Sequence, residues 1–562
     1  MSRYHAAYGH FPTKNRCHFR TVVTMFYFWI LLSSSASGDS SASYEAFRNA
    51  LRNHIVTSSP GGELLVVGGA VRTLFSLTKV YHNRAFEPLW VDAEGLNEQG
   101  AELLEALAAA HNHGISPARY RLATLRILAD NNVAALRPKQ QVDLELLLTD
   151  GFLLHAADLA AGRVDPAELD PLWQAYHRIH DLPALIEKAV TEGPRTALED
   201  LTPPHPEYTA LQAELHHVLN EPAVDWSPVP PGEKMTLNSR GERVTYLEQA
   251  LLALGYLNTI ANDDYDVATY NAVLAFQRDN GLQTDGIAGR STLDALNNTH
   301  PIHRWRKLAL NLERWRWLPN DLGVRHLRVN VAGFDLRLIN NGETELTMSV
   351  IVGREARRSP VMSAPMTYLV LNPSWNVPHK IAVQDKLPLL KKDPSVLSRQ
   401  GYEVYRGWGP DASPIDPAII DWSTLSPEQF PYRLRQQPGP ENALGRIKFM
   451  FPNKFDVYLH DTPTKSLFAR TERAFSSGCI RVEQPVALAL ALLKDDPNWT
   501  QDSLEAAFSR GREQVVHLKQ PVPVHLLYWT AWVETNGTAR FLRDIYARDE
   551  RLDSALRLAD GG

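Results

Sequence analysis

Apolar residues recur at helical spacing through the first part of the chain. Leu103 and Leu107 lie on the same face of one such segment, and a longer apolar run begins at Val142. A period of about 3.6 residues is typical of amphipathic helices that pack on a core. Aspartate–proline pairs then mark turns beyond these runs. Residues 40–220 are therefore expected to form a helical scaffold domain.

The pattern breaks at residues 221–240. Four of the thirteen residues at 221–233 are prolines, which prevent regular structure, so this stretch is expected to be a linker. Helical spacing returns at 241–298, where Asp266 stands at the N-cap position of a second helix. The first helix carries one apolar stripe, on Val244, Leu247, Leu251 and Leu254. The sequence thus predicts a small three-helix module.

From Arg325 onward the apolar period changes from about 3.6 to 2, which predicts strands. Residues 323–510 are expected to form a mostly-β, sandwich-like domain, joined to the module by a connecting helix at 299–322. At about 380–431, charged helix formers, glycines and prolines interrupt the strand rhythm, which indicates an inserted capping subdomain. Residues 511–562 are expected to pack on this domain. The predicted fold class is multidomain α+β.

The N-terminal residues have the order of a secretory signal. Basic residues precede an apolar run at 22–32 and a stretch of small residues at 33–38. The run is shorter than the ~20 residues that a membrane-spanning helix needs. Residues 1–38 are therefore interpreted as a cleaved signal peptide, with a retained N-terminal anchor as the alternative.

Composition removes some classes of function. The chain of 562 residues is 44% hydrophobic and 22% charged, and its net charge of −6 lacks the basic excess of a nucleic-acid binder. The histidine pairs His111/His113 and His216/His217 lack cysteine or glutamate at metal-ligand spacing, so no metal site is expected. Of the two cysteines, Cys17 lies inside the signal, so export would leave Cys479 as the lone thiol. The thiol alone is also compatible with a buried apolar cysteine.

His460 and Cys479 stand nineteen positions apart, and Gly478 precedes the cysteine. A thiol of ordinary pKa, about 8.5, is mostly protonated at neutral pH, and a neighbouring imidazole can take its proton to produce a nucleophile. The glycine would turn the backbone and leave the N–H groups of Gly478 and Cys479 to bind an oxyanion. Arg481 would either bind a substrate carboxylate or lock the loop through a buried pair. Spacing alone does not define the mechanism.

Two segments carry a resemblance to known families. Residues 241–298 closely resemble the type 1 peptidoglycan-binding domain, through Y-D-x-x-T-x-x-A-V-x-x-F-Q-x-x-N-G-L-x-x-D-G-I. Y-L-H-D-T-P at 458–463 and S-S-G-C-I-R-V at 476–482 resemble the active-site signature of the YkuD-type L,D-transpeptidases. The layout resembles the large periplasmic, YcbB-like subgroup. The wider family commonly has histidine before Gly-Cys, where this chain has Ser477, as that subgroup does.

The resemblance implies roles for several residues. Cys479 would be the nucleophile, His460 the proton donor and acceptor, and Gly478 the oxyanion-hole backbone. The backbone carbonyl of Asp461 would orient His460, with the Asp461 carboxylate as a rival. Further substrate-binding candidates are Arg481, Ser477, Tyr458, Trp375 and Asn442. The two aromatic residues are equally compatible with a place in the β core.

The resemblance also implies a reaction on peptidoglycan stem peptides in the periplasm that needs no metal or organic cofactor. Cys479 would release D-Ala from a tetrapeptide stem and pass the acyl group to the diaminopimelate amine of another stem, giving a 3-3 cross-link. Water, a D-amino acid or a wall-anchored lipoprotein are alternative acceptors, and a non-catalytic wall-binding scaffold is the more distant alternative. Carbapenem-type inhibitors are expected to acylate Cys479. The protein is expected to be monomeric and could act beside other wall-synthesis enzymes.

Overall fold

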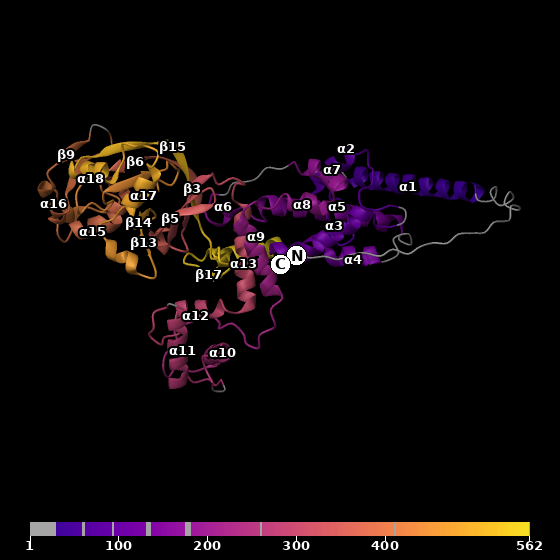
Figure 1. Ribbon diagram of the computed structural model, residues 1–562, viewed down its shortest axis with the longest axis horizontal. Coiled ribbons are helices and arrows are strands. Elements are labelled where there is room, and N and C mark those ends of the chain that lie inside the picture. The colour runs from indigo at the N-terminus through magenta and orange to yellow at the C-terminus, as the bar shows by residue number, and fades with distance from the viewer. Residues whose placement is uncertain are drawn as a thin grey trace, which may run out of the picture. The chain divides into compact units, whose positions relative to one another are not determined.

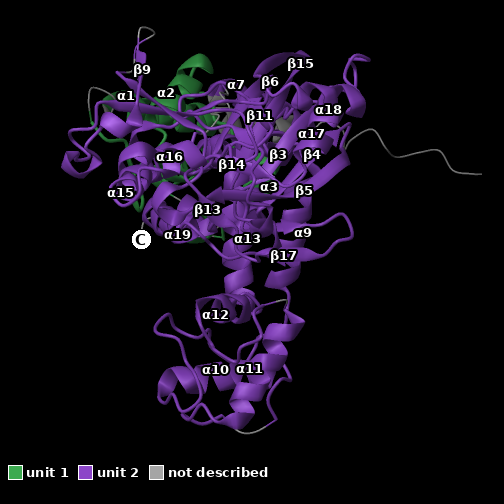
Figure 2. Cartoon of the chain, turned by 90° about the vertical axis from the view of Figure 1, so that its left-hand side faces the viewer, with its two compact units in different colours: residues 1–104, 123–150 green, residues 105–122, 151–562 purple. Residues whose placement is uncertain are grey.

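The protein is described here by a computed structural model. It covers residues 30–560 except 59–61, 93–94, 131–136, 175–180, 259–260, 281, 408 and 410–411. The expected signal peptide at 1–38 lies outside the residues whose side chains are described. The chain divides into two compact units, one of residues 1–104 and 123–150 and one of residues 105–122 and 151–562 (Figure 2). Within the described part, no helix combines the length and apolarity needed to cross a bilayer.

The first unit is mainly helical and contains one two-stranded antiparallel ribbon. Its elements are α1 (Ile30–Ser58), β1 (Leu65–Val66), β2 (Gly69–Ala70), α2 (Leu74–Asn83), most of α4 (Leu122–Asp130), and parts of α3 (Glu98–Ala108) and α5 (Pro138–Ala161). On α5 the buried Glu145 accepts hydrogen bonds from the Tyr81 hydroxyl and from the backbone N–H groups of Leu89, Trp90 and Val91. This fully bonded carboxylate ties α5 to the chain after α2, which is a structural role.

Helices continue in the second unit up to the module at 241–298. They are η1 (Ala109–His113), η2 (Pro117–Tyr120), α6 (Pro166–Leu169), α7 (Leu182–Glu192), α8 (Pro194–Glu199) and α9 (Pro206–Leu219). The module itself contains α10 (Glu242–Ala253), α11 (Val267–Asp279) and α12 (Arg290–Asn297) (Figure 1). The N-cap prediction is confirmed, because the Asp266 carboxylate accepts a hydrogen bond from the Thr269 N–H at 2.9 Å.

The proline-rich stretch before this module is more than a spacer. Trp226, Val229 and Met235 are buried in the same apolar cluster as the helices of the module. Prolines prevent helix and strand there, but they do not prevent apolar side chains from packing. The connecting helix, α13 (Pro301–Arg316), follows the module and is largely buried, with Arg316 paired to Glu313 at 2.7 Å.

A nine-stranded sheet dominates the rest of the second unit. Its order is β13-β5-β14-β12-β11-β6-β15-β3-β4, and a further β4–β5 pairing closes eight of the strands into a ring. The strands are β3 (Arg325–Asn330), β4 (Asp335–Asn340), β5 (Glu343–Gly353), β6 (Met362–Leu371), β11 (Ile447–Met450), β12 (Leu459–His460), β13 (Ala474–Ser476), β14 (Ile480–Val482) and β15 (Gln514–Leu527). In the expected sandwich-like domain, the sheet thus closes on itself through the pairing of β4 with β5.

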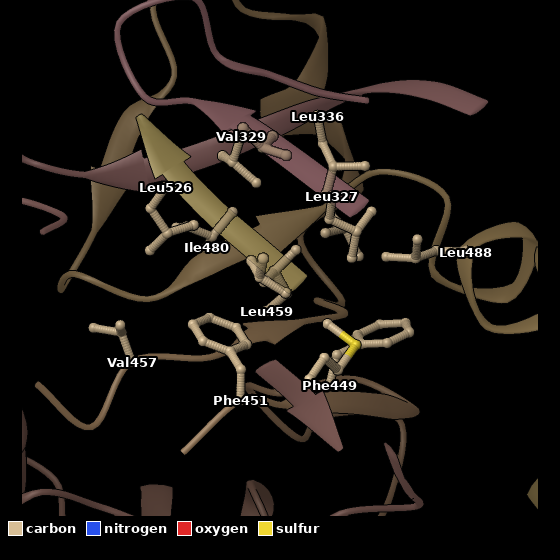
Figure 3. Packing of buried hydrophobic residues seen from close by; sticks show 14 of the residues in the cluster. Leu327, Val329, Leu336, Phe449, Phe451, Val457, Leu459, Ile480, Leu488 and Leu526 are labelled. Carbon is tan, nitrogen blue, oxygen red and sulfur yellow. The ribbon is translucent and has the colours of Figure 1, made fainter. Parts of the chain in front are cut away.

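The core of this domain follows from strand alternation. Alternate residues of several strands point inward and are almost completely buried (Figure 3). They include Leu327, Val329, Leu336, Phe449, Leu459, Ile480 and Leu526. The helices and short strands that accompany the sheet are η4 (Glu355–Arg357), η8 (Lys465–Ala469), α17 (Pro485–Leu492), α18 (Gln501–Ser509), β16 (Ala531–Val533), β17 (Ala539–Phe541) and α19 (Arg548–Ala559).

The C-terminal segment differs from its prediction. β15 lies inside the sheet, antiparallel to β6 and parallel to β3. Residues 514–527 therefore form part of the sheet itself, whereas 511–562 were expected to pack on the β domain as a separate segment. Sequence patterns identify strands, but they do not say which strands pair across long separations.

The inserted subdomain has a sheet and an apolar core of its own. Its four strands have the order β7-β10-β8-β9. The elements are β7 (Trp375–Asn376), α14 (His379–Ile381), η5 (Ala382–Lys386), α15 (Leu387–Leu390), α16 (Val396–Arg399), β8 (Tyr402–Arg406), β9 (Ser413–Ile415), η6 (Pro417–Ile419), η7 (Trp422–Thr424) and β10 (Tyr432–Gln436). Because β7 pairs with β10, the subdomain runs from 375 to 436 and exceeds the predicted 380–431 at both ends.

Phe449→Ala tests the packing of the main sheet. Phe449 is fully buried, so its truncation should destabilise the protein by about 3–5 kcal/mol. Urea unfolding followed by tryptophan fluorescence should show the loss. Phe475→Ala is the matched control, because that ring is 41% exposed and its removal should change stability by less than about 0.5 kcal/mol. Equal effects of the two substitutions would contradict the described core.

Candidate active site

Three neighbouring strands place three polar side chains in one row. Lys448 on β11 lies opposite His460 on β12, and His460 lies opposite Arg481 on β14. Paired residues on adjacent strands point to the same face of a sheet. The residues beside them in sequence point to the other face and are fully buried: Ile447, Phe449, Leu459, Ile480 and Val482. Lys448, His460 and Arg481 consequently share one face, and all three line a cavity of about 1270 Å³.

Cys479 and Tyr458 reach the same cavity by the same alternation. Cys479 stands two positions before Arg481, and Tyr458 stands two positions before His460. Both line the cavity, and Cys479 is half-buried there. The structure therefore brings the predicted nucleophile and its predicted base into one cavity.

The loop before Cys479 is held from two sides. The Ser476 hydroxyl donates to the Cys479 carbonyl at 2.5 Å, and the Ser359 hydroxyl donates to the Gly478 carbonyl at 2.7 Å. Gly478 has a φ of +120°, a backbone conformation that is essentially restricted to glycine. The predicted need for a glycine at this turn thus has a direct geometric basis.

The oxyanion-hole prediction for Gly478 needs a correction. The Gly478 N–H donates to the Ser476 hydroxyl oxygen at 3.1 Å, so it is already engaged. Among the described contacts, the Cys479 N–H has no acceptor. Of the two backbone donors expected to bind an oxyanion, Cys479 is therefore the one left for it. The sequence could not reveal that a serine two positions before the glycine would turn back onto it.

The orientation of His460 is settled by its own strand end. Its Nδ1 lies 2.6 Å from the backbone carbonyl oxygen of Asp461, to which it donates a hydrogen bond. The Asp461 carboxylate instead accepts from the N–H groups of Arg446 and Thr462 and from the ammonium of Lys465. Of the two rival orienters, the carbonyl is thus the one that contacts the ring. Since Nδ1 carries the proton, Nε2 is the basic nitrogen of neutral His460.

Burial keeps both His460 and Cys479 uncharged. It lowers the pKa of His460 to about 3, with the positive charges of Arg481 and Lys448 acting in the same direction. Burial also raises the pKa of the Cys479 thiol, although hydrogen bonds from Tyr458 and the charges of Lys448 and Arg481 oppose this effect. No hydrogen bond joins the two side chains within the described part of the chain. The resting site thus holds a neutral thiol and a neutral imidazole, where the sequence suggested an ion pair.

The remaining candidates divide into cavity and core residues. Trp375, at the edge of the inserted subdomain, and Ser477, beside the catalytic loop glycine, both line the cavity. Asn442 does not. It is buried, and its amide donates to the carbonyl oxygens of Pro373 and Gln437 at 3.0 and 2.9 Å. The structure therefore does not bring Asn442 to the cavity with the other candidates, and its side chain holds a loop together.

A clamp that the sequence did not indicate joins the inserted subdomain to the loop that carries Cys479. The Arg357 guanidinium forms two hydrogen bonds with the Asp385 carboxylate, at 2.5 and 2.9 Å, and donates to Gln384 at 2.7 Å. It also donates to the Ser477 hydroxyl at 2.9 Å. Asp385 lies in the π-helical turn η5, and π-turns are frequent at functional sites. One buried guanidinium thus holds both sides of the cavity.

Lys448 is a second residue that sequence reasoning missed. Its ammonium lies 4.0 Å from the centre of the Tyr458 ring. The alternation of I-K-F-M is compatible with Lys448 facing away from the core, but it does not say that β11 lies beside β12. Metal ligation has no support within the described residues, where no group of three acidic, histidine or cysteine side chains could hold an ion.

The raised thiol pKa predicts the pH dependence of Cys479 alkylation. The rate of modification by iodoacetamide should keep rising above pH ~8.5, the ordinary thiol midpoint. Tyr458→Phe should move the profile to still higher pH, because it removes a hydrogen bond that stabilises the thiolate. Peptide mapping by mass spectrometry measures the modification. Tyr405→Phe is the control, since that hydroxyl bonds Glu403 in the inserted subdomain. A plateau below pH 7 would instead indicate a thiolate–imidazolium pair.

Asp385→Asn tests the clamp. The substitution leaves the Arg357 guanidinium, only 8% exposed, without its carboxylate. The inserted subdomain should then open more often, and trypsin cleavage within 375–436 should accelerate on the order of fivefold, the factor that about 1 kcal/mol gives. Asp393→Asn is the matched control, because Asp393 pairs with Arg399 inside the subdomain. A similar cleavage rate for both variants would argue against a clamp.

Comparison with family models assigns three parts of the chain. Residues 76–215 match a scaffold domain, and residues 240–296 match a family described as “Putative peptidoglycan binding domain”. Residues 324–498 match the L,D-transpeptidase catalytic domain of the YkuD family. The last range contains every cavity residue of the row across β11, β12 and β14. It ends before β15.

A similar curated protein and two solved structures add context. A protein of Haemophilus influenzae named “Putative L,D-transpeptidase” is 38% identical over 250 residues, which span 44% of this chain and 49% of that protein. The chain thus matches about half the length of that relative. An L,D-transpeptidase structure from Xylanimonas cellulosilytica is 16% identical, covering 53% of this chain and 99% of that one, with a TM-score of 0.15. One from Stackebrandtia nassauensis is 14% identical, covering 55% and 97%, with a TM-score of 0.19.

The TM-scores of these two structures are low, so the family assignment rests on the family models and the curated relative. The cysteine, the histidine and the loop glycine all lie in the matched catalytic range. The chain therefore carries a YkuD-type L,D-transpeptidase catalytic domain, together with a scaffold domain and a peptidoglycan-binding domain.

Proposed function

We propose that the protein is a peptidoglycan L,D-transpeptidase that uses Cys479 as its nucleophile. The observation that carries the proposal is the hydrogen bond from His460 Nδ1 to the Asp461 carbonyl. It leaves Nε2 as the basic nitrogen in the cavity that also holds the thiol. An oriented imidazole beside a thiol is the arrangement that nucleophilic acyl transfer requires. The peptidoglycan-binding domain supplies the class of substrate.

The first half-reaction forms a thioester. The Cys479 sulfur attacks the carbonyl carbon between diaminopimelate and the terminal D-Ala of a tetrapeptide stem, while His460 Nε2 takes the thiol proton. The oxyanion of the tetrahedral intermediate is placed near the free Cys479 N–H. The C–N bond then breaks, and His460 returns the proton to the amine of the departing D-Ala. Because both groups rest uncharged, proton transfer accompanies the attack.

The second half-reaction transfers the acyl group. The side-chain amine of a second diaminopimelate attacks the thioester, His460 takes its proton, and the C–S bond breaks to return that proton to Cys479. The product is a 3-3 cross-link. Water, a D-amino acid or a lipoprotein lysine would use the same thioester, and the shape of the acceptor side decides among them. A non-catalytic scaffold is the remaining alternative, and the geometry around Cys479 argues against it.

Location and inhibition follow from this function. A protein that acts on peptidoglycan works outside the cytoplasm, and the N-terminal sequence pattern points to the periplasm. Carbapenem-type β-lactams present a strained carbonyl to the same thiol, so they should acylate Cys479. A monomer suffices for the reaction, because all the named groups come from one chain. That the protein acts together with other wall-synthesis enzymes stays a prediction.

Products formed from tetrapeptide-containing muropeptides test the function. The wild-type protein should form cross-linked dimers, and Cys479→Ala should lower turnover by at least about 10³-fold, because it removes the nucleophile. Mass spectrometry identifies the products, and circular dichroism with thermal unfolding checks that the variant is folded. Tripeptide monomers would indicate hydrolysis. Unchanged substrate with folded wild type would leave the scaffold role.

A further inference from the structure

Two cations in the cavity lack the counter-ions that their neighbours have. Within the described residues, Arg357 pairs with Asp385 and Arg358 with Asp170. In the same described part of the chain, no carboxylate lies within 4 Å of the Lys448 ammonium or of the Arg481 guanidinium, and Glu513 and Asp456 act on Lys448 only from farther away. The Nε of Arg481 is buried and has no hydrogen-bond partner. These two side chains therefore have charge and donors available for a ligand.

The placement of both cations is strict. They stand on either side of His460 in the row across β11, β12 and β14. The Lys448 ammonium is further held over the Tyr458 ring, which lies against the Cys479 thiol. A cation removed from water without a partner is unfavourable, and an anion that binds between two such groups restores the balance. If Lys448 only supported the fold, nothing would require its ammonium to lack a carboxylate partner.

The donor peptide offers a matching anion. In a stem that ends in D-Ala, the terminal carboxylate is two bonds from the scissile amide nitrogen. The Tyr458 side chain contacts both the Lys448 ammonium and the Cys479 thiol, so an anion bound by Lys448 would be close enough to the nucleophile to fit that short separation. The second carboxylate of diaminopimelate lies at the far end of a longer side chain, so it is a less direct match.

We propose that Lys448 and Arg481 form a subsite that binds the terminal carboxylate of the donor peptide and so places the scissile carbonyl at Cys479. The proposal rests on the transpeptidase function above and adds the group that selects the donor. Lys448 is the residue on which the test depends, because Arg481 also adjoins the catalytic loop. Bound in this way, the D-Ala carboxylate would leave with the product of the first step.

The test compares three synthetic donors with the full-length protein. One tetrapeptide ends in D-Ala with a free carboxylate, the second ends in D-alaninamide, and the third is amidated only at the diaminopimelate side-chain carboxylate. Release of D-Ala or D-alaninamide is measured by mass spectrometry for wild type and for Lys448→Met, Lys448→Arg and Lys454→Met. Lys454 is an exposed lysine that does not line the cavity, so it is the matched control.

The expected result is a loss of discrimination. Wild type should prefer the free acid over the D-alaninamide donor by about 10- to 100-fold in kcat/KM, the value of one charge-assisted hydrogen bond. Lys448→Met should bring that ratio near one by slowing only the donors with a terminal carboxylate. Lys448→Arg should keep much of the preference, and Lys454→Met should keep all of it. If Lys448 had a purely structural role, Lys448→Met would lower kcat/KM for all three donors by the same factor.

Other outcomes overturn the proposal. Equal losses on acid and amide donors would show that Lys448 only supports the site. If wild type lost activity only with the donor amidated at diaminopimelate, the subsite would be assigned to the diaminopimelate carboxylate. Binding to the Cys479→Ala protein, measured by calorimetry, separates this question from catalysis. If wild type makes no product but that variant binds the acid over the amide in a Lys448-dependent way, the transpeptidase function fails and the subsite stands. Equal binding of acid and amide refutes the subsite.

Discussion

The parallel pairing of β12 with β14 is the constraint on which the site depends. It places His460 beside Arg481, and the same register leaves Tyr458 and Cys479 on the cavity face. The buried neighbours Leu459 and Ile480 hold this register, because a slip by one residue would turn both out of the core. The eighteen residues between histidine and cysteine can therefore vary in path while the two side chains stay together. The geometry of the pair is a property of the sheet and needs no direct bond between the two side chains.

The electrostatic state of the site follows from that position. Side chains at the end of buried strands lose hydration, which disfavours both a thiolate and an imidazolium. The pKa values of Cys479 and His460 accordingly move in opposite directions, away from an ion pair. A neutral thiol is also less reactive toward unwanted electrophiles, since the thiolate is the reacting species. On the proposed mechanism, activation occurs when a bound carbonyl draws charge from sulfur and His460 accepts the proton.

Much of this architecture could be predicted from the sequence, and the failures have physical reasons. Local rules suffice for the three-helix module and its cap at Asp266, because hydrogen bonds within a few residues define them. Motif reasoning located Cys479 and His460. The sequence did not show that Asn442 lies outside the cavity, because its burial and its hydrogen bonds to Pro373 and Gln437 arise only in the folded loop. Lys448 and β15 were missed because strand order is a long-range property, which alternation within one strand does not encode.

The proposed carboxylate subsite also bears on the strength of the base. Arg481 and Lys448 both lower the pKa of His460 by their charge. An anion bound between them would offset that charge, so the imidazole would accept a proton more readily with a donor in place than without one. The coupling is reciprocal, because protonation of His460 would in turn strengthen binding of the carboxylate. On this proposal the same two cations keep the empty site neutral and unreactive, and they make the occupied site basic when the scissile carbonyl is at hand.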